Sequence, residues 1–361
     1  LVAGDRTARA DRGAYFAASE WLVMGGRVEV EGPEERVFSD SLRVAVRAGD
    51  FWVHGATVIL GVDGSWTVRC ERGRVAEDSG WVAGRAERAW VRRGGEGVWA
   101  DSLAWSEAAG LREAWGDVEA LDTALTRVVR GAHLVQQRTD SVWASRADGG
   151  ALLVQAGEAD TLVVQAEVLE QADGTLRAFP DVVFQQGDAL GACGQLIWSE
   201  SDSLLLFQQD PRLWFEGQIL SADTLQLTLR NGSPDRLIGL GHAHLTHVLN
   251  DSCADQISGR TLHGEFEDGL LHRLLIAGNG EAIYFVEDGE ALQFNRAACS
   301  RMRIGLHDGA VREIALLDAP NGRFIAVAAS VPAERWLEGT VLHVPPTPPE
   351  VHPWPPSVPR D

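Results

Sequence analysis

The sequence predicts an all-β protein, an elongated, solenoid-like stack of short strands with two sides. Three observations predict this fold class. A short phrase of aspartate, serine or threonine, and an apolar residue recurs along the chain; apolar residues alternate with polar ones after it; and glycine-containing turns separate the alternating runs. Helical periodicity is weak, and we expect at most a short helix within residues 106–128.

The recurring phrase sets the size of the repeat. Its copies lie 18 to 21 residues apart, or two or three times that distance. A unit of about 20 residues holds two short strands and two turns, which is less than a three-sided β-helix coil needs, so we expect a two-sided cross-section. The copies begin at Asp40, Asp101, Asp122, Asp140, Asp160, Asp202 and Asp223.

The aspartates of this phrase have two interpretations. In the first, their carboxylates form a ladder that binds Ca²⁺ or acts on sugars. In the second, each side chain hydrogen-bonds the backbone of a turn where a strand begins. Calcium-binding repeats need several oxygen ligands per turn and a glycine-rich loop, which this sequence lacks, so we favour the second interpretation.

Composition argues against several function classes. The net charge is −20 and all 32 basic residues are arginine, so P-loop and lysine Schiff-base chemistry are excluded and no nucleic-acid partner is expected. A strand through Gly241–His247 offers at most two histidines on one face, so we expect neither a metal nor a cofactor. Hydrolase and dinucleotide signatures are missing, and we predict that the chain is not an enzyme and has no catalytic residues.

The cysteines and the ends of the chain are less informative. The four cysteines (Cys70, Cys193, Cys253 and Cys299) are either buried thiols or two disulfides. The sequence opens without a basic and then apolar segment, so we expect that any secretory signal has been removed. Eight of the 14 prolines fall within residues 345–361, and we expect this tail to be disordered or polyproline II.

Two parts of the sequence resemble a known family. Residues 26–30 (GRVEV), followed by residues 39–42 (SDSL), are similar to a signature of OstA-like proteins, the lipopolysaccharide-transport family that includes LptA. The segments 256–266, 278–284, 295–300 and 320–322 resemble the end of the longer members. The resemblance covers about residues 14–340. We therefore expect an N-terminal extension (1–13), two jellyroll halves (14–190 and 191–340, which are continuous or separate) and the proline-rich tail (345–361).

The resemblance implies a fold and a function. Family members are β-jellyrolls whose two sheets form a V, with an apolar interior that shelters the acyl chains of lipopolysaccharide. They stack edge to edge in the periplasm of Gram-negative bacteria. The implied partners are therefore lipopolysaccharide, through its lipid A acyl chains, and other Lpt-type bridge proteins or a second copy, through edge-strand pairing.

We predict the lining of this groove from the alternating positions. The predicted lining residues are Leu42, Val44, Val46, Leu103, Trp105, Leu162, Val164, Leu204, Leu206, Leu225, Leu227 and Leu229. Plain core packing gives the same alternation, so a structural repeat with a filled interior is one alternative. A second alternative is a β-helix that binds or acts on polysaccharide, with aspartates and tryptophans at an outer cleft.

Overall fold

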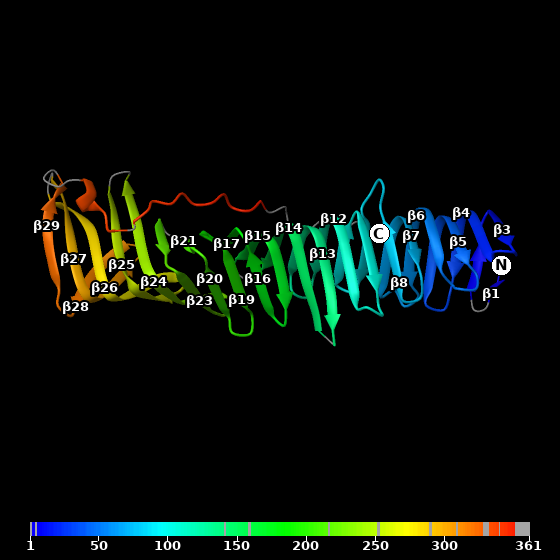
Figure 1. Ribbon diagram of the computed structural model, residues 1–361, viewed down its shortest axis with the longest axis horizontal. Helices are drawn as coiled ribbons and strands as arrows, with labels where there is room; N and C mark the ends of the chain where they lie inside the picture. Colours follow the sequence, from blue (N-terminus) through cyan, green and yellow to red (C-terminus); the bar gives the residue numbers. More distant parts are fainter. Residues whose placement is uncertain are drawn as a thin grey trace. The chain divides into compact units, whose positions relative to one another are not determined.

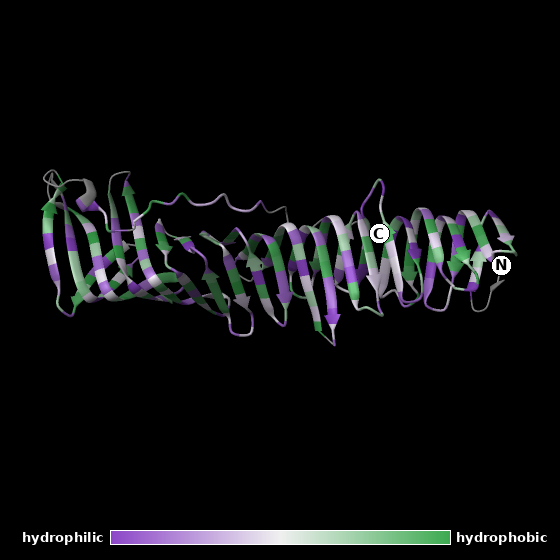
Figure 2. Cartoon of the chain, viewed as in Figure 1, coloured by the Kyte–Doolittle hydropathy of each residue, from purple (hydrophilic) through white to green (hydrophobic). Residues whose placement is uncertain are grey.

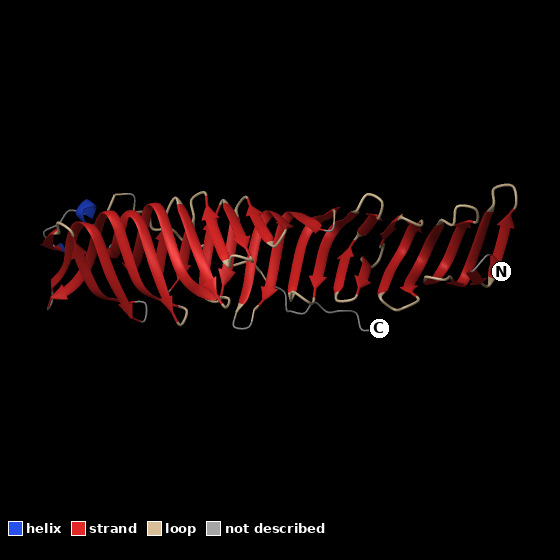
Figure 3. Cartoon of the chain, turned by 90° about the horizontal axis from the view of Figure 1, so that it is seen from below, coloured by secondary structure: helices blue, strands red, loops and turns tan. Residues whose placement is uncertain are grey.

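The computed structural model describes residues 2–3, 6–140, 142–157, 160–215, 217–250, 253–288, 291–307, 310–327, 332–338 and 340–350. Nearly all of them lie in antiparallel strands joined by short turns (Figure 3), which confirms the all-β prediction. None of these residues belongs to a helix that is long and apolar enough to cross a membrane. The chain forms two compact units, residues 1–156 with 167–173, and residues 157–166 with 174–361.

The first unit holds fourteen strands and the second part of β15 (Figure 1). The strands are β1 (Val2–Ala3), β2 (Arg6–Arg9), β3 (Arg12–Phe16), β4 (Trp21–Glu31), β5 (Glu35–Ala45), β6 (Phe51–Gly61), β7 (Trp66–Val75), β8 (Ser79–Ala83), β9 (Ala89–Arg93), β10 (Glu96–Ala100), β11 (Ser102–Ser106), β12 (Leu111–Asp122), β13 (Arg127–Thr139), β14 (Val142–Ala156) and β15 (Thr161–Ala172).

Strand pairing in the first unit separates into two ladders. From β7 to β12, one ladder runs through β8 and β11 and the other through β9 and β10. The long strands take part in both ladders: residues 111–115 of β12 pair with β11, and residues 119–122 pair with β10. A register shift separates the two halves of β12, as a β-bulge does where a strand bends. The expected two-sided cross-section is therefore present in this unit.

The second unit begins with the first part of β15, and its last described parts are a 3-10 turn, η2 (Pro332–Arg335), and residues 340–350, which lack regular structure. Its strands are β16 (Thr175–Phe179), β17 (Val182–Gln186), β18 (Ala189–Cys193), β19 (Gln195–Ser199), β20 (Leu204–Gln208), β21 (Arg212–Phe215), β22 (Gln218–Ser221), β23 (Thr224–Arg230), β24 (Ser233–Asn250), β25 (Cys253–Glu267), β26 (Leu270–Asp288), β27 (Ala291–His307), β28 (Ala310–Leu317) and β29 (Asn321–Ala326).

Two ladders also form the second unit. One runs β15, β17, β18, β21, β22 and the other β16, β19, β20, β23. Both end on β24, where β23 pairs with residues 233–240 and β22 with residues 244–247. The two ladders face each other, because the rings of Phe184 and Phe207 meet edge to face with 5.5 Å between their centroids. The apolar core of the unit lies between them.

One expectation is corrected. The helix allowed within residues 106–128 is absent, because Leu111–Asp122 form β12. Its bulge places the buried residues Ala114, Val118 and Leu121 four and three positions apart, a spacing that imitates a helix. Within the expected N-terminal extension (1–13), β2 pairs with β4. Residues 345–350 of the expected tail lack regular structure, and residues 351–361 lie outside the described residues.

The four cysteines are free, buried thiols, so the disulfide alternative is wrong. Burial raises the pKa of Cys70 and of Cys193 to about 12. These thiols therefore stay protonated at neutral pH and serve as small apolar side chains.

Candidate functional site

The candidate site is the interior between the two ladders of each unit. Hydropathy alternates along the strands, as Figure 2 shows, and most of the buried residues are apolar. In the first unit Leu42 lies between Met24 of β4 and Val53 of β6, and all three are buried. The same face continues through Val82 of β8 and Leu103 of β11, which are register partners.

The opposite ladder of the first unit contributes a second apolar surface. Its buried cluster consists of Trp90, Trp99, Leu121 and Val128. The indole rings of Trp90 and Trp99 stack with 6.3 Å between their centroids. An ion pair between Arg130 and Glu119, which joins Nε to Oε2 at 2.9 Å, borders this cluster. Two of the tryptophans that crowd the first third of the sequence therefore serve as core.

The second unit also has a packed interior. Phe207 and Leu225 are register partners with essentially no exposed surface, and Leu205 and Leu227 form the neighbouring pair. From the facing ladder, Phe184 meets Phe207, and its register partner Val164 is fully buried. The interior is thus closed by side chains from both ladders.

The structure brings eight of the predicted lining residues to this interior. Leu42, Leu103, Leu162, Val164, Leu225 and Leu227 are buried there, and Val44 and Trp105 are half-buried toward the ends of their strands. They divide between the units: Leu42, Val44, Leu103 and Trp105 belong to the first, and the other four belong to the second.

The remaining four lie elsewhere. Leu204 and Leu206 are half-buried on the other face of β20, opposite Thr228 and Gln226, because Leu205 and Phe207 take the inner face. Val46 follows the end of β5 in a turn and is 41% exposed. Leu229 is half-buried beyond a register shift near the end of β23.

The alternation of apolar residues does not predict several residues that face the interior. Leu204–Phe207 are four consecutive apolar residues, so the sequence gives no sign of which pair points inward. Phe207, the largest of them, would have been the better guide to the inner face. Leu196, Phe184 and Leu237 are also buried there but follow no copy of the repeated phrase.

The histidines that cluster in the sequence make separate contacts in the structure. No group of three potential metal ligands occurs in the described part of the chain. The three clustered histidines separate: His242 contacts Asp223, His244 contacts Thr340, and His247 pairs with Asp255. Burial lowers the pKa of His244 to about 4, whereas the hydrogen bond that the His247 imidazole donates to the Asp255 carboxylate raises the pKa of His247. These histidines hold strands and segments together.

Comparisons with known proteins add one finding. No family model matches the sequence, and no curated protein matches it. Among solved structures, the chain is similar to LptH from Pseudomonas aeruginosa, described as the LptA homologous periplasmic component of the conserved lipopolysaccharide transport device. The identity is 14%, over 29% of this chain and 75% of that chain, with a TM-score of 0.27. A TM-score this low supports no inference about function.

Proposed function

We propose that the chain is a non-catalytic periplasmic protein that carries lipopolysaccharide, with the acyl chains held between its two ladders of strands. The observation that carries the proposal is the continuous apolar inner face found in each unit. Burial of hydrocarbon contributes about 0.8 kcal/mol per CH₂ group. Such binding needs no attraction between an acidic protein and the phosphates of the lipid.

The interior must open for this function, because its side chains fill it. Phe184 and Phe207 meet across the interior through side-chain packing, whereas backbone hydrogen bonds run within each ladder. Separating the ladders at this point therefore exposes apolar side chains and leaves strand pairing intact. An acyl chain that enters replaces the lost contacts with equivalent ones.

Edge strands support the proposed partners. Within the described residues, β28 and β29 pair only with β27, and β3 pairs only with β4. Each therefore has a row of backbone groups available to a strand of another chain. We propose that these edges pair with a second copy or with other Lpt-type bridge proteins.

Native mass spectrometry of the protein purified from a Gram-negative envelope tests the carrier proposal. The wild type is expected to retain lipopolysaccharide or lipid A. Leu227→Asp, which places a charge on the inner face, is expected to lose it, whereas Gln226→Asp places the same charge on the other face and retains it. A cooperative thermal transition verifies that each variant is folded. A wild type that neither retains nor takes up lipopolysaccharide contradicts the proposal.

A further inference from the structure

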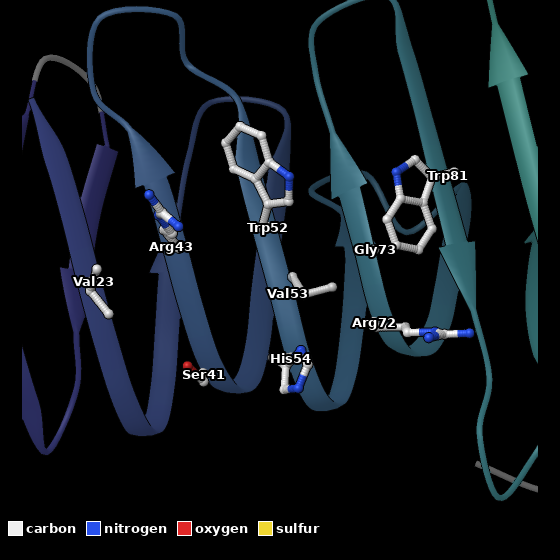
Figure 4. A pocket seen from close by; sticks show the side chains of 9 residues that line it. All are labelled: Val23, Ser41, Arg43, Trp52, Val53, His54, Arg72, Gly73 and Trp81. Carbon is white, nitrogen blue, oxygen red and sulfur yellow. The ribbon is translucent and has the colours of Figure 1, made fainter. Parts of the chain in front are cut away.

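The outer face of β5–β8 carries an ordered grid of side chains unrelated to the interior. In one row, register pairing places Arg43, Trp52, Arg74 and Trp81 side by side on four successive strands. In the next row Ser41, His54 and Arg72 are neighbours. These residues alternate with Leu42, Val53 and Val82, which face the interior. Six of the seven, all but Arg74, help to line a surface cavity of about 360 Å³ (Figure 4).

The charge of this cavity is opposite to that of the chain. The protein has a net charge of −20, yet no acidic residue lines the cavity. Arg74, beside it, is neutralised by Asp50, with 2.6 Å between Nη2 and Oδ2. Arg43 and Arg72 are exposed, and neither makes an ion pair within the described part of the chain. Two exposed guanidinium groups that lack an acidic partner among the described residues favour an anionic ligand on this acidic protein.

The indole rings add a second kind of contact. Trp81 is 42% exposed, and Trp52 is half-buried two strands away, at a distance of about 10 Å from strand spacing. Trp52 is supported by Trp21, whose ring centroid lies 4.8 Å away, and Arg43 lies over Trp21 with Cζ 3.9 Å from the centroid. These contacts hold Arg43 and Trp52 in position before any ligand arrives.

Small side chains extend the surface beyond Trp81. Its register partner on β11 is Ala104, and Ala83 and Ser102 occupy the adjacent row. Ser102 is followed on β12 by Trp115, which is 36% exposed and stacks on His133. Exposed indoles separated by small residues give a shallow track for a chain of rings, rather than a pocket for one compact molecule.

We propose that this outer face binds an anionic glycan, whose sugar rings stack on Trp52 and Trp81 and whose carboxylate or phosphate groups pair with Arg43 and Arg72. Stacking on aromatic rings is how proteins hold the apolar faces of sugars, and guanidinium groups bind both anions through paired hydrogen bonds. The site is independent of the lipid interior, because it lies on the opposite face of the same strands.

Calorimetric titration of the full chain with three oligosaccharides tests the proposal. The probes are hexagalacturonate, which carries carboxylates, phosphorylated maltohexaose, and neutral maltohexaose. We expect binding of at least one anionic probe, weakened by salt, and at least about tenfold weaker binding of maltohexaose. The anionic probe that binds more tightly identifies the charged group of the ligand.

Matched variants locate the site. The double variant Arg43→Gln/Arg72→Gln is expected to weaken anionic binding at least about tenfold, and Trp81→Ala about fivefold. Arg177→Gln removes an exposed arginine of the second unit, and Phe38→Ala removes an aromatic ring from another part of β5; both are expected to change binding less than twofold. All five substituted positions are exposed, so these variants are expected to fold. Failure of both anionic probes to bind, or equal losses in the control variants, overturns the proposal.

Discussion

Asp40 and Gly55 meet where β5 and β6 bend, and the carboxylate of Asp40 occupies the space that a side chain at position 55 would need. Asp40 Oδ2 accepts a hydrogen bond from the backbone N–H of Ala56 at 2.8 Å, and a Cβ atom at Gly55 would lie 2.4 Å from the same oxygen. Gly55 also has a φ of 86°, which favours glycine. The same carboxylate approach occurs in the pairs Asp101 with Gly116, and Asp223 with Gly241. In the repeated phrase, Asp40 thus accepts a backbone hydrogen bond, but it does so at a bulge within β5 and not in a turn where a strand begins.

Gly55→Ala is expected to lower the free energy of unfolding by about 2–4 kcal/mol, through a strained φ and a steric clash. Gly64→Ala is the matched control, since Gly64 has a φ of 72° and nothing within 4 Å of its added Cβ; it is expected to cost about 1 kcal/mol. Urea unfolding measures both. Adding Asp40→Ala to Gly55→Ala should restore part of the loss, and equal losses for the two glycines would refute the steric role of Asp40.

The inner and outer faces of β20 predict different mutational costs. Leu205→Ala removes a side chain that is 1% exposed and is expected to cost about 2–5 kcal/mol of unfolding free energy. Leu206→Ala, one position away on the outer face, is expected to cost less than about 1.5 kcal/mol. Chemical denaturation of both variants measures the difference, and the reverse order would show that β20 presents its other face to the core.

Gln256 holds the C-terminal segment on the second unit. Its buried side chain amide accepts hydrogen bonds from Leu337 N at 2.8 Å and from Thr340 Oγ1 at 2.7 Å, and it donates to the Arg335 carbonyl. Loss of these bonds in Gln256→Ala is expected to cost about 2–4 kcal/mol of docking free energy. Hydrogen exchange should then show faster exchange in residues 335–343. Gln226→Ala serves as control, and unchanged protection in Gln256→Ala would contradict this anchoring role.

His244 makes this anchoring sensitive to acid. Its pKa is about 4 in the folded chain and near 6.5 when solvated, so the unfolded chain binds the proton more readily. Stability contributed by the neutral imidazole is present above pH 6.5 and is lost as the pH falls toward 4. At about 1.4 kcal/mol per pKa unit, the loss amounts to about 3 kcal/mol.

Comparing the wild type with His244→Gln between pH 7 and pH 4 isolates this effect. His247, whose pKa is raised by Asp255, titrates in both proteins and so cancels in the comparison. We expect the unfolding free energy of the wild type to fall more steeply with acid than that of the variant. Parallel curves for the two proteins would mean that His244 does not titrate with unfolding.

Local sequence patterns predict most of the fold. Leu42 and Leu225 face the interior as expected, because alternation within a strand fixes their faces once one buried position is known. The same reasoning failed at Leu204 and Leu206, where a run of apolar residues hides the phase of the alternation. It failed at β12 because the bulge shifts that phase, and two shifted halves resemble a helix.

Contacts between residues far apart in the chain could not be predicted from the sequence. Gln256 and Thr340 are separated by 84 positions, and nothing in either segment indicates that they meet. The outer row of Arg43, Trp52 and Trp81 also depends on strand register, which joins residues that the sequence spaces irregularly. Register follows from hairpin geometry and bulges over the whole sheet, so a single strand does not reveal it.

The most direct test of the central claim places a photo-crosslinker in the interior. A benzophenone amino acid replaces Phe207, which has no exposed surface, or Phe38, which is exposed on the outer face of β5. Each protein is irradiated with purified lipopolysaccharide and analysed by mass spectrometry. The carrier function predicts a lipid adduct at position 207 and none at position 38. An adduct at neither position, or equal adducts at both, would contradict binding of acyl chains between the ladders.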